Sequence, residues 1–347
     1  MPFADLPQPF TRAEALSHGV TARVLDRSLT RSLLIRIAPG LYAVPSPWEA
    51  LPPWDRHAAL ARTCVRVTPD AVVSHLSAAS LLELPMPTHP PPRATMTLLD
   101  DARTSRPDDW RRFHRGATPP GHVLIRQGHP YLVAARTVVD CGRDLPPGDA
   151  LAVVDGALRR GLVTGAGLVA MRRHQRRWPG ITALDRILPL ADGLRESWFE
   201  SSSAFLMASW DVPPGIPQVV VRDSHGRFVA RVDVLWPELG VVGEADGRGK
   251  YLLGATEGTS PDETAAAAVI EQAARESRLR DLGLEVVRWD PRDLRTPLVL
   301  LDRFHGAVAR GRPDAVTARF ECSCCARPLT DCDRPTKIRG LGPLRGG

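Results

Sequence analysis

Apolar and polar residues alternate in short runs between residues 218 and 245, and turn-forming residues separate the runs. Alternation of this kind is typical of strands that bury one face, so it predicts strands over 218–222 and 228–236 and a third strand after Gly240. The sequences Asp-Ser-His-Gly and Pro-Glu-Leu-Gly fill the two intervening turns. We therefore expect a three-stranded antiparallel meander.

The second turn of this meander would bring two carboxylates together. In a simple hairpin, residues whose numbers sum to about 476 or 477 face each other, so Asp233 and Glu244 should have Cβ atoms roughly 5 Å apart. Two carboxylates at that distance repel each other unless a cation or a proton lies between them. The pair therefore predicts a metal site.

Further polar residues are expected beside this pair. Asp246 projects from the same face as Glu244, because side chains along a strand repeat every two residues. The first turn predicts Gln218 opposite Arg231, one step diagonal from the pair, and Lys250 follows on a glycine-rich segment. Hard oxygen ligands of this kind suit Mg²⁺ or Mn²⁺. The predicted metal ligands are Asp233, Glu244 and Asp246.

Helical patterns flank the meander on both sides. A mostly apolar stripe with helical spacing predicts a helix over 192–209, with Glu196 and Glu200 together on another face. Ser-Pro-Asp-Glu at 260–263 has the form of a capping box and predicts a helix from there to about Leu282. A last apolar run predicts a strand over 284–289. The element order is therefore α-β-β-β-α-β.

This order, with an acidic residue on the first helix, Asp on the second strand and Glu-x-Asp-Gly on the third, resembles the PD-(D/E)XK nuclease superfamily. It is most similar to the branch of very-short-patch-repair endonucleases. The resemblance implies that the carboxylates hold Mg²⁺ and activate a water against a phosphodiester, while a cation stabilises the developing charge. The matching residues are Glu200, Gln218, Asp233, Glu244, Asp246, Gly247, Lys250, Glu271 and Arg275.

Several positions depart from the superfamily pattern. Asp246 stands where a lysine is expected, so the catalytic cation would be Lys250 or an arginine of the second helix. Gln272 stands where similar chains have a lysine, and Ser202 and Ser203 stand where similar chains often have an arginine. The alternative to a metal site is that Asp233 and Glu244 are ordinary solvated carboxylates on a surface hairpin. Two hypotheses therefore remain for the nuclease-like domain: that it hydrolyses DNA, or that it only recognises DNA.

A second pattern begins near the amino terminus. It predicts short helices over 11–18 and 22–30, the second capped by Thr21, and then short strands over 33–38 and 41–44. A helix, a tight turn, a second helix and a small hairpin make the winged helix-turn-helix arrangement, whose second helix enters the major groove of DNA.

Arginines dominate this amino-terminal segment. Between residues 12 and 36, five arginines outnumber Glu14 and Asp26, and such an excess of positive charge suits the phosphate backbone of double-stranded DNA. No aromatic residue is interleaved with them, which argues against single-strand stacking. The alternative is a small interaction module with solvated arginines. The predicted DNA-binding residues are Arg12, Arg23, Arg27, Arg31 and Arg36.

Residues 54–189 mix predicted helices with extended segments at 95–99 and 122–126. His75 lies just inside a capped helix start, where a buried histidine is more common than a ligand. Together with the amino-terminal segment, SHLSAASLLELP (74–85) and RTVVDCGRDLP (136–146) resemble the AbiEi family of antitoxins. The resemblance covers most of residues 10–175. It implies operator binding, autorepression and a nucleotidyltransferase-type toxin as a partner.

Composition narrows the class of protein. A length of 347 residues suits two or three domains, and a net charge of +6 favours polyanionic partners. The start lacks the features of a signal peptide and no apolar run approaches about 18 residues, so we expect a cytoplasmic protein without membrane contact.

Six cysteines divide into two groups. Cys64 and Cys141 are isolated and are expected to be buried as small apolar side chains. Four crowd the tail: Cys322, Cys324, Cys325 and Cys332. The first and third have zinc-knuckle spacing but lack a matching second pair, so we predict a flexible, reduced tail and keep zinc binding as the alternative.

Proline-rich segments give the expected boundaries of an α+β / α/β multi-domain chain. We predict a winged helix-turn-helix over 1–50, an AbiEi-like mixed α/β domain over 54–189, an α-β-β-β-α-β restriction-endonuclease-like domain over 190–310 and a flexible tail over 311–347. The predicted function is a DNA-binding regulator of antitoxin type. The alternatives are a Mg²⁺-dependent DNA endonuclease, of nicking or repair type, directed by the winged helix, and a protein-interaction scaffold.

Overall fold

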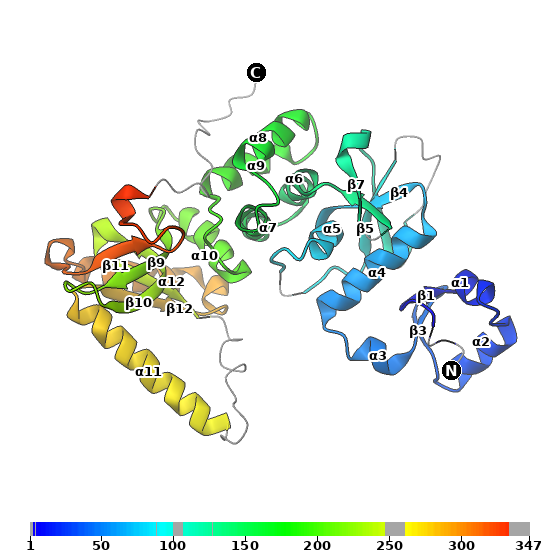
Figure 1. The fold of residues 1–347 in the computed structure, drawn as a ribbon, viewed down its shortest axis with the longest axis horizontal. Helices are drawn as coiled ribbons and strands as arrows, with labels where there is room; N and C mark the ends of the chain where they lie inside the picture. Colours follow the sequence, from blue (N-terminus) through cyan, green and yellow to red (C-terminus); the bar gives the residue numbers. More distant parts are fainter. Residues whose placement is uncertain are drawn as a thin grey trace. The chain divides into compact units, whose positions relative to one another are not determined.

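The computed structural model describes residues 3, 5–87, 89–99, 107–126, 128–246 and 261–332 (Figure 1). These residues form a mixed α/β structure with three β-sheets. Their contacts divide the chain into two compact units, Met1–Leu145 with Gly167–Ile181, and Pro146–Ala166 with Thr182–Gly347. Among the helices that the structure describes, none combines the length and apolar character needed to cross a lipid bilayer.

The first unit begins with a small sheet of order β1-β3-β2. Its strands are β1 (Phe10–Thr11), β2 (Ile35–Ala38) and β3 (Leu41–Ala43), and the helices between them are α1 (Arg12–Ser17) and α2 (Ala22–Thr30). Thr11 and Glu14 cap α1 reciprocally, and the Thr21 side chain caps α2. Both predicted helices and the predicted hairpin are confirmed, whereas β1 had no sequence signal because it is two residues long.

The proline-rich segment after this sheet is helical. It contains α3 (Pro45–Glu49) and the start of α4 (Pro53–Val67), each with proline in the first turn, where the missing N–H costs nothing. Helix α4 binds the preceding segment, since Thr63 Oγ1 donates to the Pro9 carbonyl at 2.8 Å and Arg66 pairs with Glu14 at 2.8 Å. The predicted linker at 45–53 therefore does not separate two independent bodies.

A five-stranded sheet of order β6-β5-β4-β8-β7 follows in the same unit. Its strands are β4 (Ala71–Val73), β5 (Ala94–Leu98), β6 (Arg111–His114), β7 (Val123–Arg126) and β8 (His129–Leu132). The other helices of this region are α5 (His75–Leu81), α6 (Ala134–Asp144) and α8 (Gly165–His174). The extended segments predicted at 95–99 and 122–126 correspond to β5 and β7. Cys64 and Cys141 are fully buried, as predicted.

The second unit contains a five-stranded sheet of order β12-β11-β10-β9-β13. Its strands are β9 (Ile216–Arg222), β10 (Phe228–Trp236), β11 (Val241–Ala245), β12 (Glu285–Trp289) and β13 (Arg319–Cys322). The long helices are α10 (Trp198–Ala208), α11 (Pro261–Asp281) and α12 (Pro297–Arg310). Strand β10 is antiparallel to β9 and β11, and β12 is parallel to β11. The predicted order α-β-β-β-α-β is confirmed.

Short 3₁₀ helices in the chain span Pro120–His122, Ile181–Ala183, Leu188–Leu190, Pro237–Leu239, Asp293–Arg295, Pro313–Ala315 and Leu329–Asp331.

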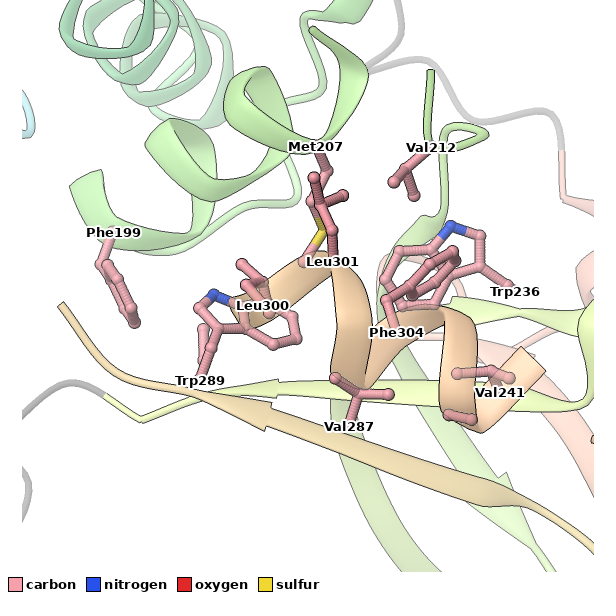
Figure 2. Close-up of a cluster of buried hydrophobic side chains, with 12 residues drawn as sticks. Phe199, Met207, Val212, Trp236, Val241, Val287, Trp289, Leu300, Leu301 and Phe304 are labelled. Atoms are coloured by element: carbon pink, nitrogen blue, oxygen red, sulfur yellow. The ribbon is translucent and has the colours of Figure 1, made fainter. Parts of the chain in front are cut away.

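Side chains of α10 and α12 bury one face of this sheet (Figure 2). Phe304 of α12 meets Trp236 edge to face at 5.0 Å between ring centroids, and Trp289 donates from Nε1 to Ser203 Oγ at 2.8 Å. Burial of such large rings is worth roughly 2–3 kcal/mol each. This core fixes α10, and therefore Glu200, against the sheet.

Two predicted boundaries in this unit are wrong. The helix predicted over 192–209 begins only at Trp198, because the Ser197 side chain caps it and accepts from the Glu200 amide. Glu196 therefore precedes the helix. The predicted domain boundary at 189–190 also differs from the division of the two units. Helices α7 (Pro147–Arg159) and α9 (Leu184–Ile187) belong to the second unit, because buried Asp155 of α7 pairs with Arg195 at 2.8 Å.

The flexible tail predicted from residue 311 is wrong for its first part. Strand β13 pairs antiparallel with β9, from Arg319 opposite Arg222 to Cys322 opposite Val219, and a 3₁₀ helix follows at Leu329–Asp331. Arg222 and Glu321 add an ion pair at 2.7 Å across these strands. Strand β9 would otherwise present an unpaired edge, and β13 covers it.

Candidate carboxylate site

The hairpin of β10 and β11 has the register expected from the sequence. Val234 lies opposite Gly243 and Leu235 opposite Val242, so Asp233 and Glu244 occupy the next position along the two strands. The Asp233 carboxylate accepts from the backbone amide of Ala245 at 2.8 Å, which fixes it beside Glu244. The predicted pairing of the two carboxylates is confirmed.

The register predicted for the first hairpin is wrong. Val220, rather than Gln218, lies opposite Arg231, because the turn from Asp223 to Arg227 spans five residues and a bulge follows Phe228. The shift carries Gln218 to the level of Asp233. Gln218 has a left-handed backbone, with φ of 53°, which is a strained conformation for a residue with a side chain.

Gln218 joins two carboxylates from different elements. Its amide Nε2 donates to Glu200 on α10 at 2.9 Å and to Asp233 on β10 at 3.4 Å. The Gln218 side chain is buried, and its Oε1 atom has no hydrogen-bond partner within the described residues. A buried carbonyl oxygen without a partner costs about 1–3 kcal/mol, so this position of Gln218 is unfavourable for stability alone.

Glu200 has a local and a tertiary role. Its carboxylate accepts from the Glu196 amide and from Ser197 Oγ, both at 2.9 Å, which completes the cap of α10. Burial and, secondly, the negative charge of Asp233 raise the pKa of Glu200 above its ordinary value. Glu200 and Asp233 also line a cavity of about 50 Å³, together with apolar residues that include Met207 and Trp236.

Glu244 is the most perturbed carboxyl of the cluster. Burial raises its pKa to about 7, the guanidinium of Arg275 on α11 opposes this in part, and Asp233 adds to it. Arg275 forms an ion pair with the Glu244 carboxylate and donates to the Arg231 carbonyl at 3.1 Å. The site therefore holds a carboxylate that can lose or gain a proton near neutrality.

Asp246, the third predicted metal ligand, pairs with Arg288 of β12 at 3.1 Å. Arg288 also reaches Glu276 of α11 at 3.1 Å. The sequence analysis did not predict a role for Arg288. It lies opposite Glu244 in the parallel pairing of β11 with β12. Among the described residues, no three carboxylates have oxygen atoms mutually within 4.8 Å, so the predicted ligands Asp233, Glu244 and Asp246 do not form one cluster. Arg275 and Arg288 pair with two of them.

Other predicted site residues have simpler outcomes. Lys250 and Gly247 lie outside the described residues, as does the predicted capping serine of α11. Glu271 is exposed on α11. The structure therefore brings together Glu200, Gln218, Asp233 and Glu244, and adds Arg275 and Arg288 as their cationic neighbours.

The amino-terminal arginines lie on the surface of the first unit. Arg23 and Arg27 on α2 and Arg31 at its C-cap are spaced four residues apart, so they follow one stripe opposite buried Leu25. These three, together with Arg36 of β2, form no ion pair within the described part of the chain. Arg12 differs, because it pairs with Asp26 at 3.5 Å.

The segments that resemble AbiEi antitoxins line a second cleft, of about 560 Å³, in the first unit. His75 is buried as predicted and stacks on His114 with ring centroids 3.8 Å apart. Burial lowers the pKa of both histidines, so both are neutral at physiological pH. Arg143 and Arg177 give the cleft a basic wall.

Comparisons with known proteins add little to this description. No protein-family model matches the chain. The chain is 28% identical over 226 residues to two uncharacterized proteins of Mycobacterium tuberculosis, Rv2248 and MT2308, and the match covers 65% of this chain and 78% of each relative. The crystal structure of the RV2827C protein from the same species has a TM-score of 0.35 and 17% sequence identity, and the match covers 58% of this chain and 72% of that one.

Proposed function

We propose that this protein is a DNA-binding regulator of antitoxin type, whose amino-terminal segment is a winged helix-turn-helix. The supporting observation is the stripe of Arg23, Arg27 and Arg31 on α2, with Arg36 on the adjoining hairpin, all exposed and without ion pairs within the described residues. Free guanidinium groups along one helix face suit contacts with phosphates and base edges.

Replacing Arg23 and Arg27 together by alanine should weaken binding to a fragment of the protein's own promoter. Each lost phosphate contact removes about one unit from the slope of log affinity against log salt, so the slope should fall by about two. Fluorescence anisotropy across a salt series measures both quantities. The matched control removes two exposed arginines of the second unit, Arg227 and Arg310, and should leave the slope unchanged. An unchanged slope in the first variant would remove α2 from the interface.

The antitoxin role adds a protein partner, a toxin of nucleotidyltransferase type. Its support is the resemblance of residues 10–175 to AbiEi antitoxins, whose two quoted segments line one cleft in this chain. A neighbouring gene for such a toxin would favour regulation. A neighbouring methyltransferase or repair gene would favour the second function.

The second function is a Mg²⁺- or Mn²⁺-dependent DNA endonuclease with a restriction-endonuclease-like second unit. The observation that favours it is the cluster of Glu200, Gln218, Asp233 and Glu244, with the unpartnered Gln218 Oε1. Carboxylate and amide oxygens are the ligands that Mg²⁺ prefers, so these residues fit the ion. When bound by Asp233 and Glu244, the ion would supply a water of lowered pKa. Arg275 would then stabilise negative charge on the phosphate.

Replacing Asp233 or Glu244 by alanine should abolish metal-dependent nicking of plasmid DNA and leave promoter binding intact, because the arginines of α2 are not altered. Nicking is read on agarose gels with Mn²⁺, and binding by anisotropy. Asp223→Ala is the matched control, since Asp223 is an aspartate of the neighbouring turn that pairs with Arg227. Nicking retained by both variants would exclude this mechanism, and its absence in the wild type would leave regulation as the function.

A further inference from the structure

Four cysteine thiols come together within residues 322–332. The Sγ atoms of Cys322, Cys324, Cys325 and Cys332 all lie within 4.8 Å of one another. Cys322 and Cys324 are 2.9 Å apart at Sγ, and Cys324 and Cys332 are 3.5 Å apart, distances that are too long for a disulfide bond. All four cysteines are free thiols.

Packing does not explain why these thiols gather. Cys322 is buried, but Cys324 and Cys325 are exposed and Cys332 is half-buried. Cysteines held by apolar packing behave differently, as Cys64 and Cys141 of the first unit do, since both are completely buried and apart from any other thiol. Thiols gain little from contact with each other, and three of these four are at least partly exposed, so a shared ligand would account for the arrangement.

The backbone around the thiols forms a tight turn. The Cys322 carbonyl accepts from the Ala326 amide at 2.9 Å, and the Cys322 amide donates to the Arg327 carbonyl at 2.9 Å. Ala326, directly after Cys325, has a left-handed backbone with φ of 53°. This Cys-x-x-Cys turn directs both of its thiols to the same side. The bridge between Glu321 and Pro328 then closes the turn.

A second turn returns Cys332 to the first three thiols. A 3₁₀ helix over Leu329–Asp331 carries the chain back, and the Cys332 amide donates to the Leu329 carbonyl at 3.4 Å. Tetrahedral zinc with Zn–S bonds of about 2.3 Å requires sulfur atoms roughly 3.8 Å apart. The four sulfur atoms, all within 4.8 Å of one another, already lie close to that spacing.

We propose that Cys322, Cys324, Cys325 and Cys332 form a structural zinc site with four thiolate ligands. A closed set of four sulfur ligands leaves no open coordination position, which is the mark of a structural rather than a catalytic zinc. Arg319 and Arg327, both exposed beside the turn, offset the negative charge of a tetrathiolate complex. The site is separate from the carboxylate cluster, whose oxygen ligands suit a harder cation.

The position of the site gives zinc a defined role. Cys322 is the last residue of β13 and lies opposite Val219 of β9, next in sequence to Gln218. Zinc would anchor β13 at this end and keep the edge of β9 covered, because ligation by four residues fixes the turn that follows the strand. Loss of zinc would release β13 and leave β9 as an exposed edge strand.

The test is the metal content of the full-length protein, purified in a thiol reductant without chelator. We expect one equivalent of zinc in the wild type and in Ser323→Ala, which alters the same turn without removing a thiol. Cys325→Ser and Cys332→Ser should lose most of it. Asp233→Ala should retain zinc, which separates this site from the carboxylate cluster. Zinc absent from the wild type, or retained in both cysteine variants, would overturn the proposal.

A second measurement does not depend on the folding of the variants. Wild-type protein reconstituted with Co²⁺ should show thiolate-to-cobalt charge-transfer bands together with the strong visible bands of tetrahedral cobalt. Added Zn²⁺ should remove these bands. Hydrogen exchange of peptides from β9 and β13 should accelerate when the zinc is removed by chelation, while peptides from β12 should not change. An octahedral cobalt spectrum, or an iron–sulfur chromophore in the purified protein, would overturn the assignment.

Discussion

Replacing Asp140 by alanine should destabilise the first unit by about 3–5 kcal/mol, because it leaves a buried arginine without its counter-charge. Asp140 is fully buried on α6 and accepts from Arg136 Nε at 2.7 Å and from Arg143 at 2.9 Å. The Arg136 side chain is only 1% exposed and stacks over Trp178, with its Cζ atom 4.3 Å from the ring centroid. Hydrogen exchange of the α6 amides measures the loss for this unit alone.

Two further variants separate charge burial from simple loss of volume. Asp144 lies on the same helix as Asp140, is partly exposed and pairs with Arg112. Asp144→Ala should therefore cost only about 0–1 kcal/mol, as expected for a surface ion pair. Arg136→Met combined with Asp140→Leu removes both charges and keeps apolar volume, so it should regain most of the lost stability. A double variant as unstable as Asp140→Ala would contradict this explanation.

Replacing Glu244 by glutamine should stabilise the second unit at alkaline pH and not at acidic pH. The folded-state pKa of Glu244, about 7, lies above its ordinary value of 4.5, so the folded protein keeps a proton that the unfolded chain releases. The stability that this group supplies is fully present below pH 4.5 and is lost as the pH rises through 7. Glutamine keeps the shape and removes this loss.

The expected difference is about 2 kcal/mol between pH 5 and pH 8, measured as the change in unfolding free energy of the variant relative to the wild type. Hydrogen exchange of β10 and β11 amides at the two pH values reports it. Arg275, which loses its partner, is 34% exposed and can be solvated by water. Glu285→Gln, on the neighbouring strand and paired with Arg310, is the matched control and should show little pH dependence. Equal stability of Glu244→Gln and the wild type at both pH values would contradict the raised pKa.

A carboxyl group whose pKa is raised to about 7 is more typical of a functional site than of a scaffold. Asp233 and Glu244 repel each other, and Gln218 keeps a strained backbone beside them. These features cost stability, which the ion pair with Arg275 and the hydrogen bond from the Ala245 amide offset only in part. They therefore support a bound cation or substrate, and the stability gain of Glu244→Gln would measure part of that cost.

The sequence located the carboxylate pair because its determinants are local. The Pro-Glu-Leu-Gly turn and the two-residue period of β10 and β11 fix which side chains face each other, and both can be read from adjacent residues. The α2 arginines and the Thr21 cap of α2 are local in the same way. The register predicted for the first hairpin was wrong because a turn one residue longer than expected and a bulge each shift it by one, and neither leaves a clear mark in a single sequence.

The sequence by itself thus determined the order of helices and strands in the second unit, the pairing of Asp233 with Glu244 and the arginine stripe of α2. Only the tertiary structure decided which arginines pair with the carboxylates and whether the four cysteine thiols lie close together. Arg288 reaches Asp246 across 42 residues of chain, and Cys322 ends a strand that pairs with β9 about 100 residues earlier. Contacts at such separations depend on how strands add to a sheet, because burial and edge pairing, rather than local spacing, choose the neighbours.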